Sequence, residues 1–383
     1  MSMPAEHLIA TPTLADLLQD YADAPALPVT GLASDSRQVD EGYLFLAYQG
    51  LHNHGIEFLD DARRQGACAV AFDSSTAVTP AEPGIPAYAI DDLAAKVGEI
   101  ATRFHGRPSE SLRVYGVTGT NGKTTVAWLI AQCAQLLGQR CGYLGTLGYG
   151  IEELQGDDGM TTLPAVELQE RLAGFVEQGA DYAALEVSSH GLSQRRVDGV
   201  RFEAALFTNL TRDHLDYHAS MRDYFECKAK LFIESDTLHR IINIDTPWGM
   251  QLADRCGGDV IMVSTTFDRV ANGRPYVFVR SVVAHEQGSD VVFTSAWGDG
   301  RFTLPLPGDY NVANAALVLA LMLQQGVTLD AACDALSHVT APPGRMQRLS
   351  RGGANIYVDY AHTPVAVESA LRALRSHCRG KLW

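Results

Sequence analysis

The segment from Leu112 to Gly138 constrains the fold of this chain more than any other. It reads LRVYGV, then TGTNG, then KTTVAWLIAQCAQLLG: an apolar run, a glycine-rich turn, and a run whose apolar residues recur at helical spacing. Gly138 lies where a helix C-terminal cap is expected. A strand joined through a glycine loop to a helix predicts an α/β domain with a mostly parallel sheet.

Residues 116–125, GVTGTNGKTT, form the loop of this segment. Glycines let backbone N–H groups converge on phosphate oxygens, and the helix N-terminus that follows adds partial positive charge. Lys123 can reach the outer phosphates of a nucleoside triphosphate, and the Thr124 hydroxyl can bind magnesium. The strict pattern GxxxxGK[ST] is not met, because Val117 occupies its first glycine position. A chance glycine-rich turn is the alternative, but Lys123, Thr124 and both flanking elements favour a nucleoside triphosphate enzyme.

Apolar runs outside this segment indicate how the rest of the chain is organised. Strands are expected at 43–48, 67–72, 181–187, 204–210, 240–244, 260–264 and 355–364, and a helix after the last of them. A chain of 383 residues exceeds one usual core. We expect a small N-terminal α/β domain (1–108), a linker around 105–113, a central P-loop ATPase domain (109–345) and the truncated beginning of a C-terminal domain (346–383).

Composition narrows the class of protein. The net charge is −15, from 45 acidic and 30 basic side chains, which argues against nonspecific binding to nucleic acid or anionic membrane. No apolar run reaches the roughly 18 residues of a membrane span, and the N-terminus lacks the pattern of a signal peptide. The seven cysteines are scattered without a CxxC pair, which is typical of reduced thiols. We expect a cytoplasmic protein without membrane insertion.

The form GTNGKTT resembles the Mur ligase superfamily, whose members use ATP to join amino acids to a carboxylate. Other segments resemble that superfamily in the same order along the chain: DSR (35–37), TT (161–162), LEVSSHGLSQRRV (185–197), TNLTRDHLDYH (208–218), YFECKAKLF (224–232), GDYNVANAALVLALM (308–322), PPGRMQRL (342–349) and VDYAHTP (358–364). The resemblance implies three domains, for UDP binding, for ATP hydrolysis, and a Rossmann-like domain for the incoming amino acid.

The wording EVSSHGL, TRDHLDYH and DYAHTP is similar to that of members that add a diamino acid to UDP-N-acetylmuramoyl-L-alanyl-D-glutamate. The resemblance thus implies a monomeric ligase of peptidoglycan precursor synthesis, with ATP, Mg²⁺ and an acyl-phosphate intermediate. The overall wording favours meso-diaminopimelate over L-lysine, although the selecting motif of the diaminopimelate enzymes, DNPR, has no counterpart here. A folylpolyglutamate synthase-like ligase and an inactive nucleotide-binding fragment are the alternatives.

Glu186 ends an apolar run, where the strands of an α/β sheet present residues to a ligand. A carboxylate there is costly unless it is paired or binds a metal. The resemblance makes Glu186 and His214 magnesium ligands. His214 and His218 have an HxxxH spacing that could bind zinc, but the HExxH glutamate is missing.

Lys228 and Lys230, in the stretch ECKAKLF, would ordinarily belong to a solvated helical face. They point about 200° apart on a helix, so at most one can face a site. In the Mur ligases a lysine at the position of Lys228 is carbamylated and helps to hold magnesium. A carbamate needs a neutral amine, which burial could supply by lowering the lysine pKa.

The resemblance also assigns ligand-binding residues. The ATP set is Gly119, Thr120, Asn121, Gly122, Lys123, Thr124 and Thr125, with Asn311 at adenine, Arg345 at phosphate and Asp359 at ribose. The nucleotide-sugar set is Ser34, Ser36, Leu51, His52 and Asn53 at uridine, and Thr161, Thr162, Ser188, Gln194 and Arg196 at the muramoyl peptide. The magnesium set is Thr124, Glu186, His214 and Lys228, and the catalytic set is Lys123, Lys228, Glu186 and His214. This chain reads TTLP where the family usually reads TTP.

Overall fold

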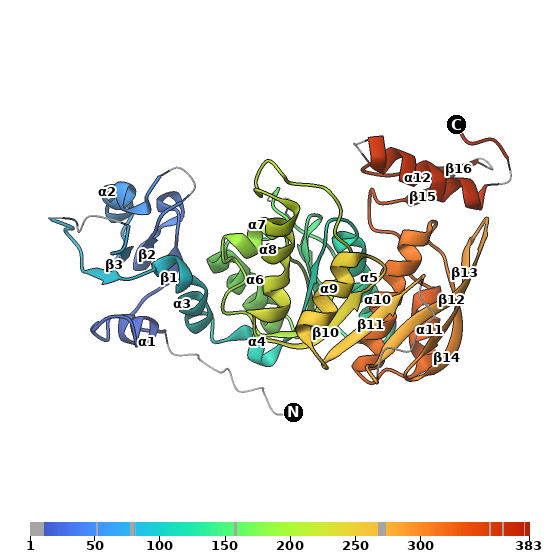
Figure 1. Ribbon diagram of the computed structural model, residues 1–383. Coiled ribbons are helices and arrows are strands. Elements are labelled where there is room, and N and C mark those ends of the chain that lie inside the picture. Colours follow the sequence, from blue (N-terminus) through green and yellow to red (C-terminus); the bar gives the residue numbers. More distant parts are fainter. Residues whose placement is uncertain are drawn as a thin grey trace, which may run out of the picture. The chain divides into compact units, whose positions relative to one another are not determined.

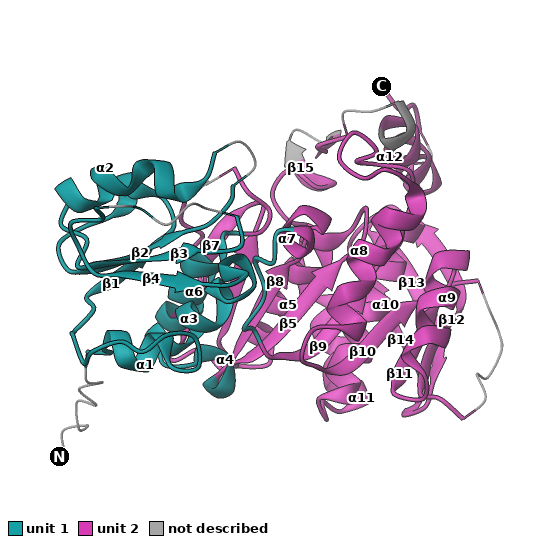
Figure 2. Ribbon diagram, turned by 60° about the vertical axis from the view of Figure 1, so that its left-hand side comes forward, with its two compact units in different colours: residues 1–111, 163–174, 194–200 teal, residues 112–162, 175–193, 201–383 magenta. Residues whose placement is uncertain are grey.

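The computed structural model describes residues 11–50, 53–76, 80, 82–156, 159–266, 273–351, 354–361, 364–378 and 380–383. It divides into two compact units, shown in teal and magenta in Figure 2. The first unit contains residues 1–111, 163–174 and 194–200, and the second contains 112–162, 175–193 and 201–383. The mixed α/β architecture predicted from the sequence is confirmed in both units, and the three-domain division stays a prediction.

The first unit is built on a parallel sheet whose strand order is β1-β2-β3-β4. The strands are β1 (Gly31–Ala33), β2 (Tyr43–Ala47), β3 (Ala69–Asp73) and β4 (Ala87–Ile90), so the strands expected at 43–48 and 67–72 are confirmed. The helices and 3-10 turns are α1 (Leu14–Leu18), η1 (Ser36–Gln38), η2 (Gly55–Phe58), α2 (Leu59–Arg64), η3 (Leu93–Ala95), α3 (Val97–Phe104) and α4 (Pro108–Ser111).

The alternation of side chains along β2 builds two cores in this unit. Leu44 and Leu46 pack on one face with the α3 residue Ile100, whereas Phe45 packs on the other face with Leu59 of α2. Successive strand residues point to opposite faces, so one short apolar strand supplies both cores.

The boundary between the two units falls inside the predicted linker at 105–113, which also contains α4 and the first residue of the next strand. Pro108 occupies the first position of α4, where its fixed backbone angle and missing N–H suit a helix start.

The second unit is built on a ten-stranded sheet whose order is β14-β13-β12-β11-β10-β9-β5-β8-β6-β7 (Figure 1). Its strands are β5 (Arg113–Thr118), β6 (Cys141–Gly145), β7 (Gly148–Gly150), β8 (Tyr182–Glu186), β9 (Phe202–Phe207), β10 (Thr237–Asn243), β11 (Val260–Ser264), β12 (Tyr276–His285), β13 (Gly288–Ser295) and β14 (Gly298–Leu304). The strands β12-β11-β10-β9-β5-β8-β6, in sheet order, pair in parallel, and β7, β13 and β14 add antiparallel edges. The strands expected between 181 and 264 are confirmed as β8 to β11.

Helices cover this sheet on both faces. They are α5 (Lys123–Leu136), α6 (Ala165–Glu177, whose first part belongs to the first unit), α7 (Ser189–Ser193), α8 (Met221–Ile233), α9 (Pro247–Cys256), α10 (Asp309–Gln324) and α11 (Leu329–Ser337). Val117 of β5 packs in the cluster of α5 and α10, whereas a Cβ on the preceding Gly116 would lie toward Leu231 of α8. The antiparallel pair β15 (Gln347–Arg351) and β16 (Ala354–Val358) and the helix α12 (Pro364–His377) follow.

The order of the central strands contains a topological switch point. β5 lies between β8 and β9, and the chain leaves β5 toward β6 on one side before it returns to β9 on the other. Open α/β sheets bind ligands at such switch points, beyond the carboxyl ends of the strands. In the described part of the chain, no helix combines the length and the apolar character that crossing a membrane requires.

Candidate functional site

The glycine loop connects β5 to the N-terminus of α5, as predicted. Gly119 has φ +147°, and a Cβ there would lie 1.9 Å from the Thr208 hydroxyl oxygen. Gly122 has φ +88°, and a Cβ there would lie 2.6 Å from the Asn314 side-chain oxygen. Both backbone angles favour glycine, and both positions lack room for a side chain. The loop is therefore packed closely against its surroundings, with the first turn of α5 beyond it.

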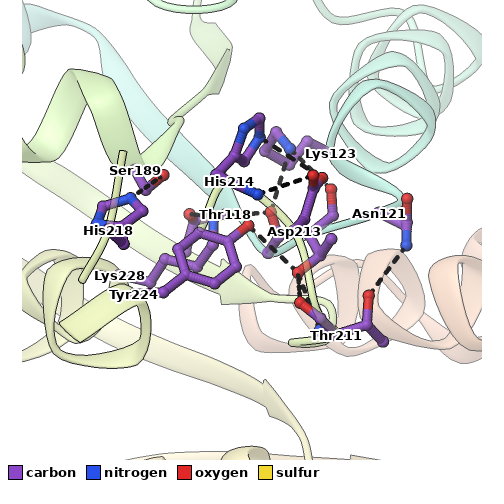
Figure 3. A network of polar contacts seen from close by, with 12 residues as sticks. Thr118, Asn121, Lys123, Ser189, Thr211, Asp213, His214, His218, Tyr224 and Lys228 are labelled. Atoms are coloured by element: carbon purple, nitrogen blue, oxygen red, sulfur yellow. Dashed lines mark hydrogen bonds and ion pairs between the residues drawn. The ribbon is translucent and has the colours of Figure 1, made fainter. Parts of the chain in front are cut away.

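The segment after β9 holds this loop from the other side. Thr208 donates its hydroxyl to the Asn121 carbonyl at 2.6 Å, and the Asn121 N–H donates to the Asn209 side-chain oxygen at 3.0 Å. The Thr211 N–H donates to the Thr120 hydroxyl at 3.0 Å (Figure 3). Sequence reasoning quoted TNLTRDHLDYH but missed that its first residues fix the loop.

Two lysines meet at one carbonyl oxygen of the loop. Lys123 donates to the carbonyls of Gly119 and Thr120 at 3.1 and 3.0 Å, and Lys228 of α8 donates to the same Gly119 carbonyl at 2.8 Å. The Lys228 ammonium also lies 4.8 Å from the centre of the Tyr224 ring. Figure 3 shows Lys228 and Tyr224 beneath the loop.

The surroundings of the two lysines lower both pKa values. Burial, followed by the charge of Lys123, lowers the pKa of Lys228 well below its usual value. Burial also lowers the pKa of Lys123, against the attraction of Glu186 and Asp213. Lys228 is only 1% exposed, whereas Lys230 is partly exposed. The ordinary reading of a solvated face is therefore wrong for Lys228.

Glu186 ends β8 and is buried. Its Oε2 accepts the hydroxyls of Thr124 at 2.8 Å and Thr146 at 3.3 Å. Its Oε1 accepts the Tyr143 hydroxyl at 2.6 Å and the Thr146 N–H at 2.9 Å. A Cβ on Gly145 would lie 2.3 Å from Oε1, so a glycine leaves room for the carboxylate. Sequence reasoning missed Tyr143 and Thr146, which lie about 40 residues from Glu186 in a segment without a quoted motif.

His214 lies in the loop that follows β9, on a backbone with φ +51°. Its ring is half exposed, with Nε2 at 3.6 Å from an Asp213 carboxylate oxygen. His218 is buried and its Nε2 is 2.9 Å from the Ser189 hydroxyl. Within the described ranges, no three His, Cys, Asp or Glu side chains are grouped to hold a metal. The HxxxH spacing therefore has no zinc cluster around it.

The chemistry of the donors indicates which ion would fit. Thr124 and Glu186 place two oxygen donors in contact beside the phosphate loop, and hard oxygen donors suit Mg²⁺. The Lys228 amine in its ordinary form supplies no oxygen and, when charged, repels a cation. Thr124 and Glu186 therefore fit a magnesium ion as they stand, and Lys228 fits only after its nitrogen has gained an anionic oxygen group.

The predicted muramoyl-peptide residues of the second unit form a chain of contacts behind Glu186. The Thr162 hydroxyl lies 3.0 Å from the Glu186 carbonyl oxygen and 3.1 Å from the Ser188 hydroxyl, which also accepts the Gly191 N–H. The Thr161 hydroxyl lies 3.3 Å from that of Thr146. These hydroxyls lie next to the strand that carries the carboxylate.

The other predicted nucleotide-sugar residues belong to the first unit. Ser36 is buried in η1, and Arg196 donates to the Gln194 side-chain oxygen at 3.0 and 2.7 Å. Ser34 and Asn53 are also described, whereas Leu51 and His52 lie outside the described residues.

The residues predicted at adenine, phosphate and ribose lie in the later part of the second unit. The Asn311 amide N–H donates to the Pro307 carbonyl at 2.8 Å, and the Asn311 side-chain oxygen accepts from the Asn314 amide. The Asn314 side chain lies against Gly122 of the loop. The Arg345 guanidinium lies 4.5 Å from the centre of the Tyr360 ring. The Asp359 carboxylate accepts the backbone N–H groups of Met346 and Ala361 at 2.8 and 2.9 Å. These bonds join the residue before β15 to the segment that follows β16.

The chain matches three family descriptions. They are "Mur ligase family, catalytic domain" over residues 28–105, "Mur ligase middle domain" over 117–322, and "Mur ligase, glutamate ligase domain" over 344–383. It is 40% identical over 385 residues to a UDP-N-acetylmuramoyl-L-alanyl-D-glutamate--2,6-diaminopimelate ligase of Alkalilimnicola ehrlichii, which covers 97% of this chain and 76% of the relative. Identity to the ligase of the same name from Haemophilus influenzae is 42% over 354 residues, or 91% of this chain and 72% of the relative.

Solved structures show the same relationship. A structure of a UDP-N-acetylmuramoyl-L-alanyl-D-glutamate--2,6-diaminopimelate ligase matches with a TM-score of 0.84 and 30% identity, over 98% of this chain and 76% of that one. MurF from Acinetobacter baumannii matches with a TM-score of 0.68 and 17% identity, over 96% of this chain and 77% of that one. A Mycobacterium tuberculosis folylpolyglutamate synthase matches with a TM-score of 0.58 and 20% identity, over 73% of this chain and 70% of that one. The last two similarities concern the fold alone.

Proposed function

This chain belongs to the Mur ligase family, and from that premise we propose that it joins meso-diaminopimelate to UDP-N-acetylmuramoyl-L-alanyl-D-glutamate at the expense of ATP. Two relatives at 40% and 42% identity carry that activity in their names. The observation that carries the proposal is the contact between Glu186 and the Thr124 hydroxyl, because it puts a carboxylate beside a phosphate-binding helix terminus. This arrangement suits a nucleoside triphosphate with a divalent cation.

The reaction has two steps. An oxygen of the substrate carboxylate attacks the γ-phosphorus of ATP, the bond to the β-phosphate oxygen breaks, and ADP leaves. The amine of the diamino acid then attacks the acyl carbon, loses a proton and displaces inorganic phosphate. Both steps bring anions or electron-rich groups together, so positioning and positive charge matter more than a protein nucleophile.

The loop provides that charge and positioning. Its N–H groups and the N-terminus of α5 would bind phosphate oxygens, and Lys123 would leave the Gly119 and Thr120 carbonyls to reach the outer phosphates. Mg²⁺, when bound, would neutralise charge between the phosphates and the entering carboxylate. We assign its protein ligands to Thr124, Glu186, His214 and Lys228.

We further propose that Lys228 binds as its carbamate. Its buried position and the neighbouring Lys123 favour the neutral amine. In the modification, the lone pair of the neutral Nζ amine forms a bond to the carbon of CO₂, one C–O π pair moves onto oxygen, and the nitrogen loses one proton, so the neutral amine becomes an anionic carbamate. The carbamate oxygens then satisfy the preference of Mg²⁺ for oxygen ligands.

The remaining contacts of the two substrates follow from the family. We assign adenine, phosphate and ribose to Asn311, Arg345 and Asp359. The nucleotide sugar is assigned to Ser34, Ser36, Leu51, His52, Asn53, Thr161, Thr162, Ser188, Gln194 and Arg196. We place the enzyme in the cytoplasm as a monomer, with an N-terminal UDP-substrate domain (1–108), a central ATPase domain (109–345) and an amino-acid-binding region from residue 346.

The activity is tested by mass spectrometry of the nucleotide product. The chain is incubated with ATP, Mg²⁺ and UDP-N-acetylmuramoyl-L-alanyl-D-glutamate, together with meso-diaminopimelate or L-lysine. We expect ADP formation that depends on the UDP substrate, and a product heavier by one diaminopimelate residue. A product with lysine alone would overturn the choice of amino acid. Thermal protection by a folate and glutamate, with none from the UDP substrate, would overturn the proposed substrate class.

A further inference from the structure

We propose that Tyr143 is a positioning residue that occupies one oxygen of the Glu186 carboxylate and leaves the other, Oε2, to bind magnesium. This inference rests on the proposed function, because it takes Glu186 as a magnesium ligand. Tyr143 lies outside every segment that resembles the family motifs. The contacts of the two side chains carry it.

The register of the sheet explains why the phenol reaches Glu186. Tyr143 of β6 pairs with Ala184 of β8 in parallel, and both residues pack in the same apolar cluster with α5. Glu186 lies two residues further along β8, so its side chain points to the same face. Two strand residues advance about 6.6 Å, which a tyrosine side chain that leans along the strand can span. The observed O–O distance is 2.6 Å.

The two carboxylate oxygens have different partners. Oε1 accepts from the Thr146 backbone N–H, which has no lone pair to offer a cation, and from the Tyr143 phenol, whose oxygen already accepts the Leu147 N–H. Oε2 accepts from two aliphatic hydroxyls, those of Thr124 and Thr146. A hydroxyl can rotate and present a lone pair to a cation instead of a proton to the carboxylate. Glu186 is therefore arranged to bind a cation through Oε2, beside the Thr124 oxygen.

The phenol itself is held in place. Tyr143 is fully buried, and the Trp128 indole packs edge-on against its ring with the centroids 5.9 Å apart. Its oxygen accepts the Leu147 N–H at 3.4 Å while it donates to Glu186.

Tyr115 offers a matched control for a role in packing alone. It is a second buried tyrosine, on the central strand β5, which pairs with the other side of β8, and it belongs to the same apolar cluster. Its ring stacks on Tyr182, with the centroids 5.6 Å apart, and its hydroxyl is not among the donors to Glu186. Tyr115→Phe and Tyr143→Phe each remove one oxygen from a buried ring, but only the Tyr143 oxygen contacts Glu186 and accepts the Leu147 N–H.

The test measures ADP affinity by calorimetry at a series of Mg²⁺ concentrations. Y143F is expected to raise the Mg²⁺ concentration for half-maximal effect about tenfold or more, in the range seen when a partner of a metal ligand is removed. ADP affinity without Mg²⁺ is expected to stay at the wild-type value. Y115F is expected to match the wild type in both measurements, and thermal unfolding checks that both variants are folded.

Glu186→Gln separates the failure of this inference from the failure of the proposed function. If E186Q raises the Mg²⁺ requirement and Y143F leaves it unchanged, the positioning role of Tyr143 is wrong and the metal assignment stands. If E186Q leaves the Mg²⁺ requirement unchanged, the assignment of Glu186 as a magnesium ligand is wrong, and the inference about Tyr143 fails with it. If Y143F and Y115F raise it equally, Tyr143 acts through packing and the inference is overturned.

Discussion

Gly145→Ala tests how closely the Glu186 carboxylate must be held. The added Cβ would lie 2.3 Å from Glu186 Oε1, whereas ordinary contacts begin at 3.4 Å. Either the carboxylate or strand β6 must therefore move by about 1 Å. The backbone of Gly145 does not have a positive φ, so alanine causes no strain beyond this collision.

The effect on the reaction should exceed the effect on the fold. A displacement of about 1 Å at a catalytic group can cost about 100-fold in rate, equivalent to about 2.7 kcal/mol. Overpacking a core typically costs about 1–3 kcal/mol of unfolding free energy, which leaves a protein of ordinary stability folded. We therefore expect turnover to fall by about two orders of magnitude in a variant that still unfolds cooperatively.

The assay is the initial rate of ADP formation at saturating ATP and Mg²⁺, with thermal unfolding in parallel. Gly258→Ala is the control, because a Cβ there meets nothing within 4 Å and its φ is not positive. G258A is expected to retain the wild-type rate. A G145A rate within about twofold of the wild type would refute the reasoning, since the 100-fold loss follows from a displaced carboxylate.

Three further predictions concern the role of Lys228 in turnover, the titration of Lys228, and the packing of Leu206 in the core. Lys228→Ala is expected to abolish turnover, with partial rescue by added short carboxylic acids, and to remove the ¹³C carbamate signal formed with labelled bicarbonate. Lys230→Ala should keep the turnover and the carbamate signal. Full turnover in K228A would contradict the role of Lys228. The folded protein lowers the pKa of Lys228 from its usual value near 10.5. Between the lowered and the usual pKa, the unfolded chain therefore binds more protons than the folded protein does. The stability of the wild type consequently rises as pH rises through this window. Lys228→Met should flatten that slope in denaturant unfolding curves measured from pH 6 to 10, and an unchanged slope would show that Lys228 does not titrate in this window. Leu206→Ala, at the last but one position of β9, where the side chain is completely buried, should cost about 2–5 kcal/mol of unfolding free energy. A cost under about 1 kcal/mol would contradict its place in the core.

The sequence predicted those parts of the site that depend on local pattern. The spacing of apolar residues around GVTGTNGKTT located β5, the loop and α5, because each of these is specified by neighbours along the chain. The same reasoning placed Glu186 at the end of a strand. Helix geometry allowed at most one of Lys228 and Lys230 to face the site, and the resemblance to the Mur ligases selected Lys228.

The parts that it missed depend on register between distant strands. Tyr143 reaches Glu186 only because β6 and β8 pair with Tyr143 opposite Ala184, and no local pattern fixes that offset. The hydrogen bond from the Asn121 N–H of the glycine loop to the Asn209 side chain likewise depends on the pairing of β9 with β5. Short helices are a second gap: α4 interrupts the expected linker, because proline and serine suit a helix start as well as a turn.

The central claim, that this site activates a carboxylate by phosphorylating it, can be tested directly with an isotope. UDP-N-acetylmuramoyl-L-alanyl-D-glutamate labelled with ¹⁸O in the γ-carboxylate of its glutamate is incubated with the chain, ATP, Mg²⁺ and meso-diaminopimelate. An acyl phosphate requires that one labelled oxygen leaves with the inorganic phosphate, which mass spectrometry detects. The account predicts one ¹⁸O in each phosphate released. Unlabelled phosphate, released at the same rate as product forms, would contradict it.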